Sequence, residues 1–245
     1  MLRALYSSAS GMESQQMNLD VIANNLANVN TTGFKKAKIE FQDLLYQTKR
    51  AAGSESGPGT QVPTSLQVGH GARPVSTAKI FTAGEIMSTG ERLDLAIHGN
   101  GFFKVTLADG TNAFTRDGGF KLDSTGQIVT SDGLPVTSFA GVTIGPEATN
   151  VSISQTGVVS VTQNGTTSTA GSLVLSRFAN PAGLENIGAN LYRETPASGT
   201  EQTGEPANAG MGTVQQGYLE LSNVKVVEEM VNLITAQRAF EFNSK

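Results

Sequence analysis

The side chains capable of acid–base, metal or nucleophilic chemistry are few and lie scattered along the chain. His70 lies in a Gly/Pro-rich stretch and His98 in an expected strand, and neither has a partner at the spacing of a metal or nucleophile motif. His98 is therefore interpreted as an ordinary strand residue. The sequence contains no cysteine, which excludes disulfides, thiolate metal sites and thiol nucleophiles. We expect a protein that is not an enzyme and that uses no metal or cofactor.

Several acidic residues lie at or near glycines in segments that read as turns. The spacing of these residues does not match a calcium-binding loop, so turn chemistry is the better interpretation; they are Asp109, Asp117, Asp123 and Asp132. The tripeptide Gly99-Asn100-Gly101 resembles part of a phosphate-binding loop. It lacks the strand-to-helix context of such loops, which favours a turn or a bulge.

Composition restricts the class of protein further. Charged residues make up 16% of the chain, below the roughly 25% usual for soluble domains. A formal net charge of −4 argues against a partner that is a nucleic acid or an acidic membrane. No segment approaches the run of about 20 apolar residues that spans a bilayer. The amino terminus lacks the apolar region of a conventional signal peptide, so we expect none to be cleaved.

The start of the chain predicts a helix from about Leu2 to about Val29. One stripe recurs at alternating spacings of three and four, as in the seam of a coiled coil; it consists of Leu2, Leu5, Ala9, Met12, Gln16, Leu19, Ala23 and Leu26. The other faces carry serine and asparagine in place of the glutamate and lysine that favour a solvated helix. A lone surface helix would explain the stripe but not the missing charges. We interpret the segment as an assembly helix that becomes stable when packed against partners.

The end of the chain predicts a second helix, from about Leu219, with a broader apolar face. Its adjoining seams would let one helix contact two neighbours; they contain Val226, Val227, Met230, Val231, Leu233, Ile234 and Phe240. Phe240 and Phe242 stand just before Lys245, which predicts a helix that stops without a cap.

Between the helices the pattern changes twice. Phe34 to Tyr46 predicts extended structure ending in a turn of helix. Residues 47–82 have the composition of a linker, and Pro63 and Pro74 argue against regular structure there. Two interpretations of this stretch remain open, disorder in the monomer or an arm laid on a neighbour in an assembly.

From about Ile86 to Ala207 the period becomes two, with hairpin signals at Asp109-Gly110, Asp132-Gly133 and Asn164-Gly165. The predicted fold class is α+β, with terminal coiled-coil-like assembly helices flanking an extended arm and a central all-β domain. The expected segments are 1–46 for the first helix and the residues after it, 47–85 for the arm, 86–209 for the β domain and 210–245 for the last helix.

Three motifs resemble those of the bacterial flagellar rod and hook protein family. The first spans Ala23–Lys35; its signature residues are Asn24, Asn25, Leu26, Ala27, Asn28, Thr32, Gly33 and Phe34. The second comprises Leu93–Phe103 with Phe114–Gly118, and the third comprises Gly217–Val224 with Gln237–Glu241. Asp43–Thr48 and Leu66–Gly69 are most similar to the distal-rod branch of this family.

The resemblance implies a structural subunit that self-assembles into a hollow, rigid drive shaft, the distal rod, which transmits torque from motor to hook across the periplasm. It implies paired terminal helices on the inner wall and type III export without a cleaved signal peptide. The implied partners are further copies of the chain, proximal rod proteins and hook protein at the ends, peptidoglycan-ring and outer-membrane-ring proteins around the shaft, and the export apparatus.

Other functions remain as alternatives. A minor proximal rod protein would share the terminal motifs. A secreted β-rich adhesin or binding module would share the central domain, but it should not need neutral, paired terminal helices. A cell-wall enzyme is the weakest alternative, because it should show a carboxylate pair or metal ligands in the β domain.

Overall fold

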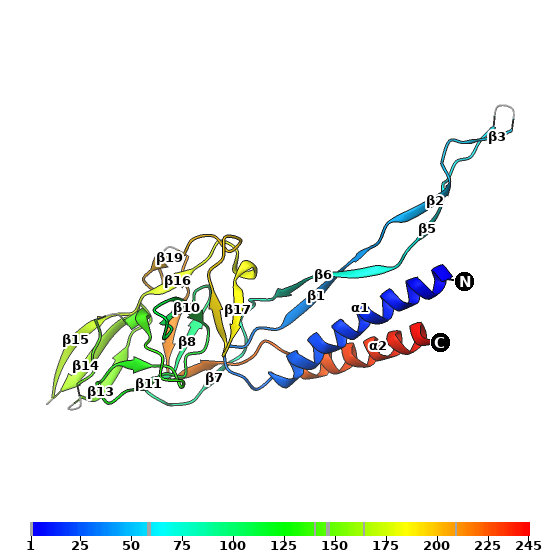
Figure 1. Ribbon diagram of the computed structural model, residues 1–245. Helices are drawn as coiled ribbons and strands as arrows, with labels where there is room; N and C mark the ends of the chain where they lie inside the picture. Colours follow the sequence, from blue (N-terminus) through cyan, green and yellow to red (C-terminus); the bar gives the residue numbers. More distant parts are fainter. Residues whose placement is uncertain (1, 58–59, 140, 146–147, 164, 209) are drawn as a thin grey trace. The chain divides into compact units, whose positions relative to one another are not determined.

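The computed structural model describes residues 2–57, 60–139, 141–145, 148–163, 165–208 and 210–245 of the chain. The chain forms two compact units (Figure 1). Unit 1 consists of Met1–Ala27, Ala37–Lys79 and Lys225–Lys245, and unit 2 of Asn28–Lys36 and Ile80–Val224. Helices at both ends of the sequence and a β-rich centre confirm the predicted α+β class.

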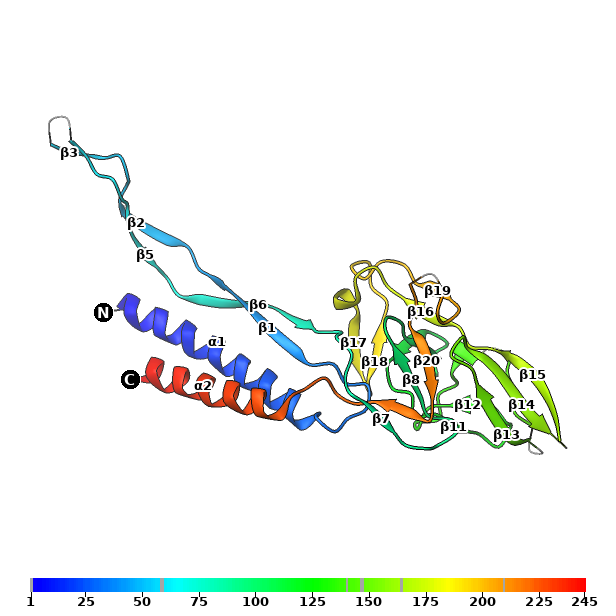
Figure 2. The same cartoon turned by 180° about the vertical axis from the view of Figure 1, so that it is seen from behind.

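Unit 1 contains α1 (Leu2–Ala27) and α2 (Val226–Ser244), which lie side by side and run in opposite directions (Figures 1 and 2). The helices approach closely where Gly11 meets Asn243, since a Cβ atom at Gly11 would lie 2.9 Å from Asn243 Nδ2. Ile22 of α1 and Ala236 of α2 are buried. Ser14 and Asn25 of α1 are buried as well, so polar residues occupy much of the buried face of α1 and few apolar side chains hold the pair.

The rest of unit 1 is a long antiparallel ribbon. β1 (Ala37–Asp43) pairs with β6 (Ala72–Lys79), β2 (Tyr46–Arg50) with β5 (Leu66–Gly69), and β3 (Glu55–Gly57) with β4 (Thr60–Gln61). The expected turn of helix before Tyr46 is wrong, because Leu44 donates its backbone N–H to Gly71 O across the ribbon, at 2.8 Å. The expectation that Pro74 prevents regular structure is also wrong. Pro74 lies in β6 beside a register shift, and in a two-stranded ribbon each strand keeps a free edge where a missing N–H is tolerated.

Unit 2 is built from short strands, as predicted. Two larger sheets have the orders β17-β18-β10-β9 and β13-β14-β15, and the other strands of this unit form two-stranded pairs. The strands are β7 (Ile86–Ser88), β8 (Leu95–His98), β9 (Phe103–Thr106), β10 (Asn112–Thr115), β11 (Lys121–Leu122), β12 (Ile128–Val129), β13 (Ala148–Ile153), β14 (Val158–Gln163), β15 (Thr166–Ser172), β16 (Leu175–Arg177), β17 (Glu185–Gly188), β18 (Leu191–Arg193), β19 (Gln202–Gly204), β20 (Thr213–Gln216) and β21 (Tyr218–Glu220). Short 3-10 turns occur at Thr137–Phe139 and Pro181–Gly183.

The last helix begins later than the sequence predicts. Residues 218–220 form β21, which pairs with β7, and α2 starts at Val226. Gly217 has φ +79°, a left-handed conformation that glycine adopts without strain, and it turns the chain from β20 into β21. Pairing with the edge of β7 therefore overrides the helical period of Leu219 and the residues after it.

The predicted turns lie between strands. Asp109-Gly110 joins β9 to β10. Asp132-Gly133 lies in the short loop that is closed by the antiparallel bridge between Val129 and Pro135. Asn164 lies outside the described residues. The core of unit 2 contains a cluster around Leu95, Phe103 and Leu175, and a second cluster in which aromatic rings meet edge to face; the buried rings of the second cluster are Phe102, Phe114, Phe178 and Tyr192.

Candidate assembly surfaces and ionic cluster

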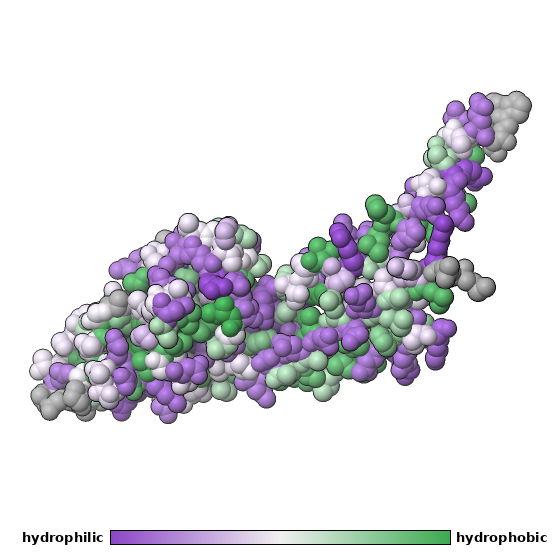
Figure 3. All heavy atoms as spheres, viewed as in Figure 1, coloured by the Kyte–Doolittle hydropathy of each residue, from purple (hydrophilic) through white to green (hydrophobic). Residues whose placement is uncertain are grey.

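The apolar stripe predicted on α1 lies largely on the surface. Leu5 is 65% exposed, Tyr6 beside it is 78% exposed, and apolar residues appear in green among polar ones on unit 1 (Figure 3). Ala9, Gln16 and Ala23 are exposed, whereas Met12, Leu19 and Leu26 are half-buried. The side chain of Leu2 lies outside the described residues.

The predicted seams of α2 are exposed to a similar extent. Val227 is 76% exposed, and half or more of each of Met230, Val231 and Ile234 is open to solvent. Leu233 and Phe240 are half-buried. We call the following set the exposed helix faces: Leu5, Tyr6, Val226, Val227, Met230, Val231, Ile234 and Phe242. Large apolar side chains exposed in such number on two helices are typical of a protein–protein contact.

Asn25 of the signature ties three segments of unit 1 together. Its side chain is buried and forms a pair of hydrogen bonds with the backbone of Ala37, at the start of β1. Its Nδ2 donates to Ala37 O at 2.8 Å, and its Oδ1 accepts from Ala37 N at 2.9 Å. The same Nδ2 lies 3.4 Å from Oε2 of Glu229, a buried residue of α2. The amide thereby fixes α1, β1 and α2 to one another.

The end of the signature is docked within unit 2. Gly33 has φ +68°, and a Cβ atom there would lie 2.5 Å from Asp117 N, so a larger residue does not fit. Thr32 Oγ1 donates to Asp117 Oδ1 at 2.9 Å, and Asn190 Nδ2 donates to Thr32 O at 3.0 Å. Phe34 is buried. These contacts explain why the motif combines a glycine with small polar residues.

Three charged side chains are buried together beside this segment, and we call them the ionic cluster: Lys35, Arg116 and Glu220. Lys35 Nζ pairs with Glu220 Oε1 and donates to Thr82 O at 2.8 Å. Arg116 Nη1 lies 3.4 Å from Glu220 Oε2, and Arg116 Nη2 donates to Gly99 O at 2.6 Å. No more than 3% of any of these side chains is exposed.

Burial dominates the electrostatics of the ionic cluster. It lowers the pKa of Lys35, and the charge of Glu220 opposes that effect. It likewise lowers the pKa of Arg116, whose guanidinium carbon lies 5.4 Å from the centre of the Phe102 ring. Burial raises the pKa of the nearby Tyr192 to about 12, with the charge of Arg116 acting in the opposite direction. The cluster is a structural tie, because each charged group is directed at a protein partner.

Local sequence pattern does not reveal the ionic cluster. A signal was present, however, because Lys35, Arg116 and Glu220 each belong to a different one of the three family motifs. Opposite charges in motifs so far apart in sequence could have suggested a buried pair. Spacing alone could not, because 185 residues separate Lys35 from Glu220.

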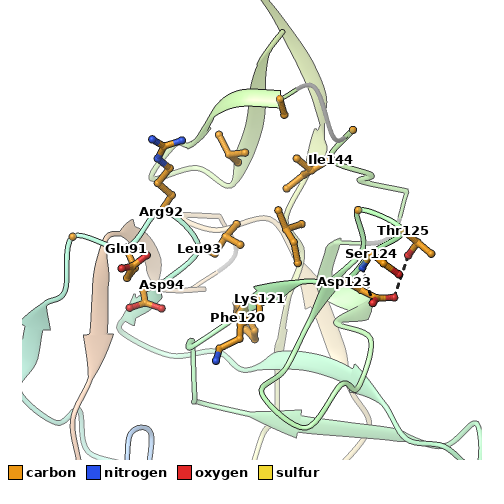
Figure 4. Close-up of a pocket in the computed structure, with 16 residues that line it drawn as sticks. Glu91, Arg92, Leu93, Asp94, Phe120, Lys121, Asp123, Ser124, Thr125 and Ile144 are labelled. Carbon is orange, nitrogen blue, oxygen red and sulfur yellow. Dashed lines mark hydrogen bonds between the residues drawn. The ribbon is translucent and has the colours of Figure 1, made fainter.

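The residues considered for chemistry serve turns and strands. Gly99 and Gly101, with φ +115° and +146°, form the turn between β8 and β9, and His98 is an exposed residue of β8. Unit 2 also has a pocket of about 830 Å³, with Glu91, Arg92 and Asp94 on one side and the β11–β12 hairpin on another (Figure 4). The Asp123 carboxylate accepts from Ser124 N at 2.6 Å and from Thr125 Oγ1 at 3.3 Å, which is turn chemistry.

Comparison with known proteins places this architecture in a class. Residues 5–35 match the model of the flagella basal body rod protein family, and residues 215–245 match the flagellar basal body rod FlgEFG protein C-terminal domain. Residues 96–161 match the D1 domain of the flagellar hook protein FlgE/F/G. These matches at both ends and in the middle of the chain define a subunit of the flagellar rod and hook class.

Relatives that match over the whole chain specify the family. The flagellar basal-body rod protein FlgG of Borreliella burgdorferi is 50% identical over 100% of this chain and 93% of its own length. FlgG of Bacillus subtilis is 45% identical over 100% of this chain and 94% of its own. A flagellar hook protein FlgE from Helicobacter mustelae is 45% identical over 56% of this chain and 30% of its own.

The chain belongs to the FlgG family of flagellar basal-body rod proteins, the distal-rod branch. It is a structural rod subunit and not an enzyme, it is located in the basal-body rod, and it assembles with other flagellar components. Among the described residues, no helix has both the length and the apolar character needed to cross a bilayer.

Proposed function

We propose that this chain polymerises into a hollow, rigid drive shaft that transmits torque from the motor to the hook across the periplasm. The observation that supports this proposal is the exposure of apolar residues on both helices, including Leu5 and Val227. Full burial of one such side chain contributes about 1.5–3 kcal/mol, so several buried at each contact can outweigh the entropy lost on association. The contact would repeat at every subunit of an open helical polymer.

In this proposal the predicted helix residues form the contacts between copies, and the two helices build the inner wall of the tube. The β domain, 86–209, faces outward, and the arm, 47–85, braces neighbouring copies. A shaft resists torsion when many such contacts carry load together. The exposed apolar residues along the ribbon support the role of the arm; they are Phe41, Leu45, Tyr46, Leu66, Val68 and Val75.

The further partners follow from the family. We propose that proximal rod proteins and the hook protein bind the two ends of the shaft. The identity to a flagellar hook protein over part of the chain supports a shared mode of contact with the hook. Peptidoglycan-ring and outer-membrane-ring proteins would surround the shaft. The chain would reach this place through the flagellar type III export apparatus, without a cleaved signal peptide.

Val231 offers a direct test of the exposed helix faces. It is 55% exposed, so Val231→Asp should leave the isolated chain folded. In the polymer, an unpaired carboxylate at this contact should cost several kcal/mol at every subunit. We expect circular dichroism like that of the wild type, with polymerisation and swimming lost.

The neighbouring Asn232→Asp is the matched control, since it adds the same charge at an exposed polar residue of the same helix. Polymers should still form from this variant. If the Val231→Asp chain forms polymers as readily as the wild type, the exposed helix faces are not the contact.

A further inference from the structure

The chain passes between the two compact units four times, after Ala27, Lys36, Lys79 and Val224. Three segments of unit 2 lie next to these crossings in the sequence, and we call them the crossing segments: 28–36, 80–84 and 218–224. They are far apart in sequence, and β21 near the end of the chain belongs to the third. The polar contacts that join the crossing segments to one another all lie within unit 2.

Glu220 contacts both of the other crossing segments. Its backbone oxygen accepts from Gly33 N at 2.8 Å, and its carboxylate pairs with Lys35 of the same segment. The carboxylate also accepts from Gly84 N at 3.0 Å, and it faces Arg116 of the β domain. With 1% of its side chain exposed, Glu220 makes these bonds away from water, where loss of one partner is costly.

Asn223 repeats this arrangement three residues later. Its Oδ1 accepts from Lys36 N at 2.7 Å, and its Nδ2 donates to Ile80 O at 2.8 Å. The same Nδ2 lies 3.0 Å from Thr82 Oγ1. Two residues of the last crossing segment therefore satisfy backbone groups of the two earlier segments.

We propose that Glu220 and Asn223 form a lock that makes the docking of the three crossing segments onto the β domain a single cooperative event. Until residues 218–224 are in place, Lys35 and Arg116 lack the carboxylate that the fold provides, and the amides of Gly33, Lys36 and Gly84 lack their acceptors. The crossing segments then dock onto the β domain only in a chain that includes residues up to Asn223. Once docked, the three segments detach together and not one by one.

A different behaviour would follow if each segment were held by its own apolar contacts. Phe34 is buried and could anchor residues 28–36 by itself. Phe81, whose ring meets the rings of Phe102 and Tyr192 edge to face, could anchor residues 80–84 in the same way. In that case removal of the Glu220 charge would loosen β21 alone. The two behaviours differ in which backbone amides lose protection, and hydrogen exchange measures that directly.

The test is hydrogen exchange, resolved by residue, on the full chain carrying Glu220→Gln. The substitution keeps the shape of the side chain and removes the charge that Lys35 and Arg116 face. We expect the amides of Gly33, Lys36 and Gly84 to lose protection together with Leu221, each by about a hundredfold or more. Loss at Leu221 with unchanged protection at Gly33 and Gly84 would overturn the proposal.

Glu201→Gln is the matched control, since Glu201 pairs with Lys104 at 2.8 Å in the same unit but remains partly exposed. It should leave the four reporter amides as in the wild type. Equal loss of protection in this control would also overturn the proposal, because the effect would then not belong to the lock.

If Glu220→Gln does not fold, exchange of the wild-type chain in increasing denaturant gives the answer instead. The amides of Gly33, Lys36, Gly84 and Leu221 should then exchange with one common opening free energy and one common denaturant dependence. Exchange of Gly33 through a separate, less costly opening would show that the segment docks by itself.

Discussion

The ionic cluster contains some of the least exposed side chains of unit 2: Lys35, Arg116 and Glu220. Charged side chains usually lie on the surface of a folded protein. Each makes hydrogen bonds to backbone groups as well as to its charged partner, which is the condition under which buried charges are tolerated. At this scale the sequence predicted the signature residues but not their partners. Gly33 illustrates the reason, because only the fold places Asp117 where a Cβ atom would collide with it.

Tyr192 provides a pH test at the scale of the residue. Burial raises its pKa to about 12, whereas an exposed tyrosine in the unfolded chain ionises near pH 10. The folded state therefore keeps this proton where the unfolded state has lost it. The associated stability is fully present below about pH 10 and is lost as the pH rises toward 12, by up to about 2 kcal/mol.

The measurement is the free energy of unfolding by urea at several pH values from 9 to 12, for the wild type and for Tyr192→Phe. The phenylalanine keeps the ring that packs against Phe81 and Phe102 but cannot ionise. We expect the variant to lose less stability over this range. Parallel curves for the two proteins would show that Tyr192 ionises as it does in the unfolded chain.

The elements divide into those that periodicity predicts and those that it does not. The spacing of apolar residues predicts the helix α1, and the alternation in the central region predicts strands; both types of element are confirmed. The apolar stripe itself lies largely on the surface of the chain. The ribbon of β1 to β6 is exposed on both faces along most of its length. Its sequence therefore lacks the alternation of apolar and polar residues that indicates a strand with one buried face. The sequence predicts helix where β21 lies, because the pairing of β21 with β7 depends on a segment about 130 residues earlier, which local pattern cannot reveal.

The arm provides a test at the scale of the element. Deletion of Ala51 to Gln61 removes β3 and β4 and leaves β2 paired with β5, from Tyr46 opposite Gly69 to Arg50 opposite Leu66. The helices are untouched, so polymers should still form. They should bend more easily, because contacts of the arm between neighbouring copies have been removed.

The readout for this deletion is the persistence length of the polymers in electron micrographs, beside that of the wild type. Replacement of the same eleven residues by a Gly/Ser segment of equal length separates the loss of sequence from the loss of length. Deleted polymers as stiff as the wild type would reduce the arm to a connection.

At the scale of the whole molecule, the chain combines a well-packed β unit with a helical unit that leaves much of its apolar surface open. Unit 2 has an extensive core around Phe103 and Leu175, whereas unit 1 packs its helices through glycine, serine and asparagine. From the missing charges on α1 the sequence predicts only that this helix packs against partners. It could not predict how the chain divides into units, because residues 28–36 join unit 2 through contacts with residues near the other end of the sequence.

The most direct test of the proposed shaft is a helical reconstruction, by electron cryo-microscopy, of polymers grown from the purified chain. We predict a straight, hollow filament in which α1 and α2 line the inner wall. In that filament Leu5, Val227 and Phe242, which are open to solvent in the isolated chain, should be buried against neighbouring copies. A filament joined through unit 2 alone, with these three side chains still in contact with water, would contradict the proposal.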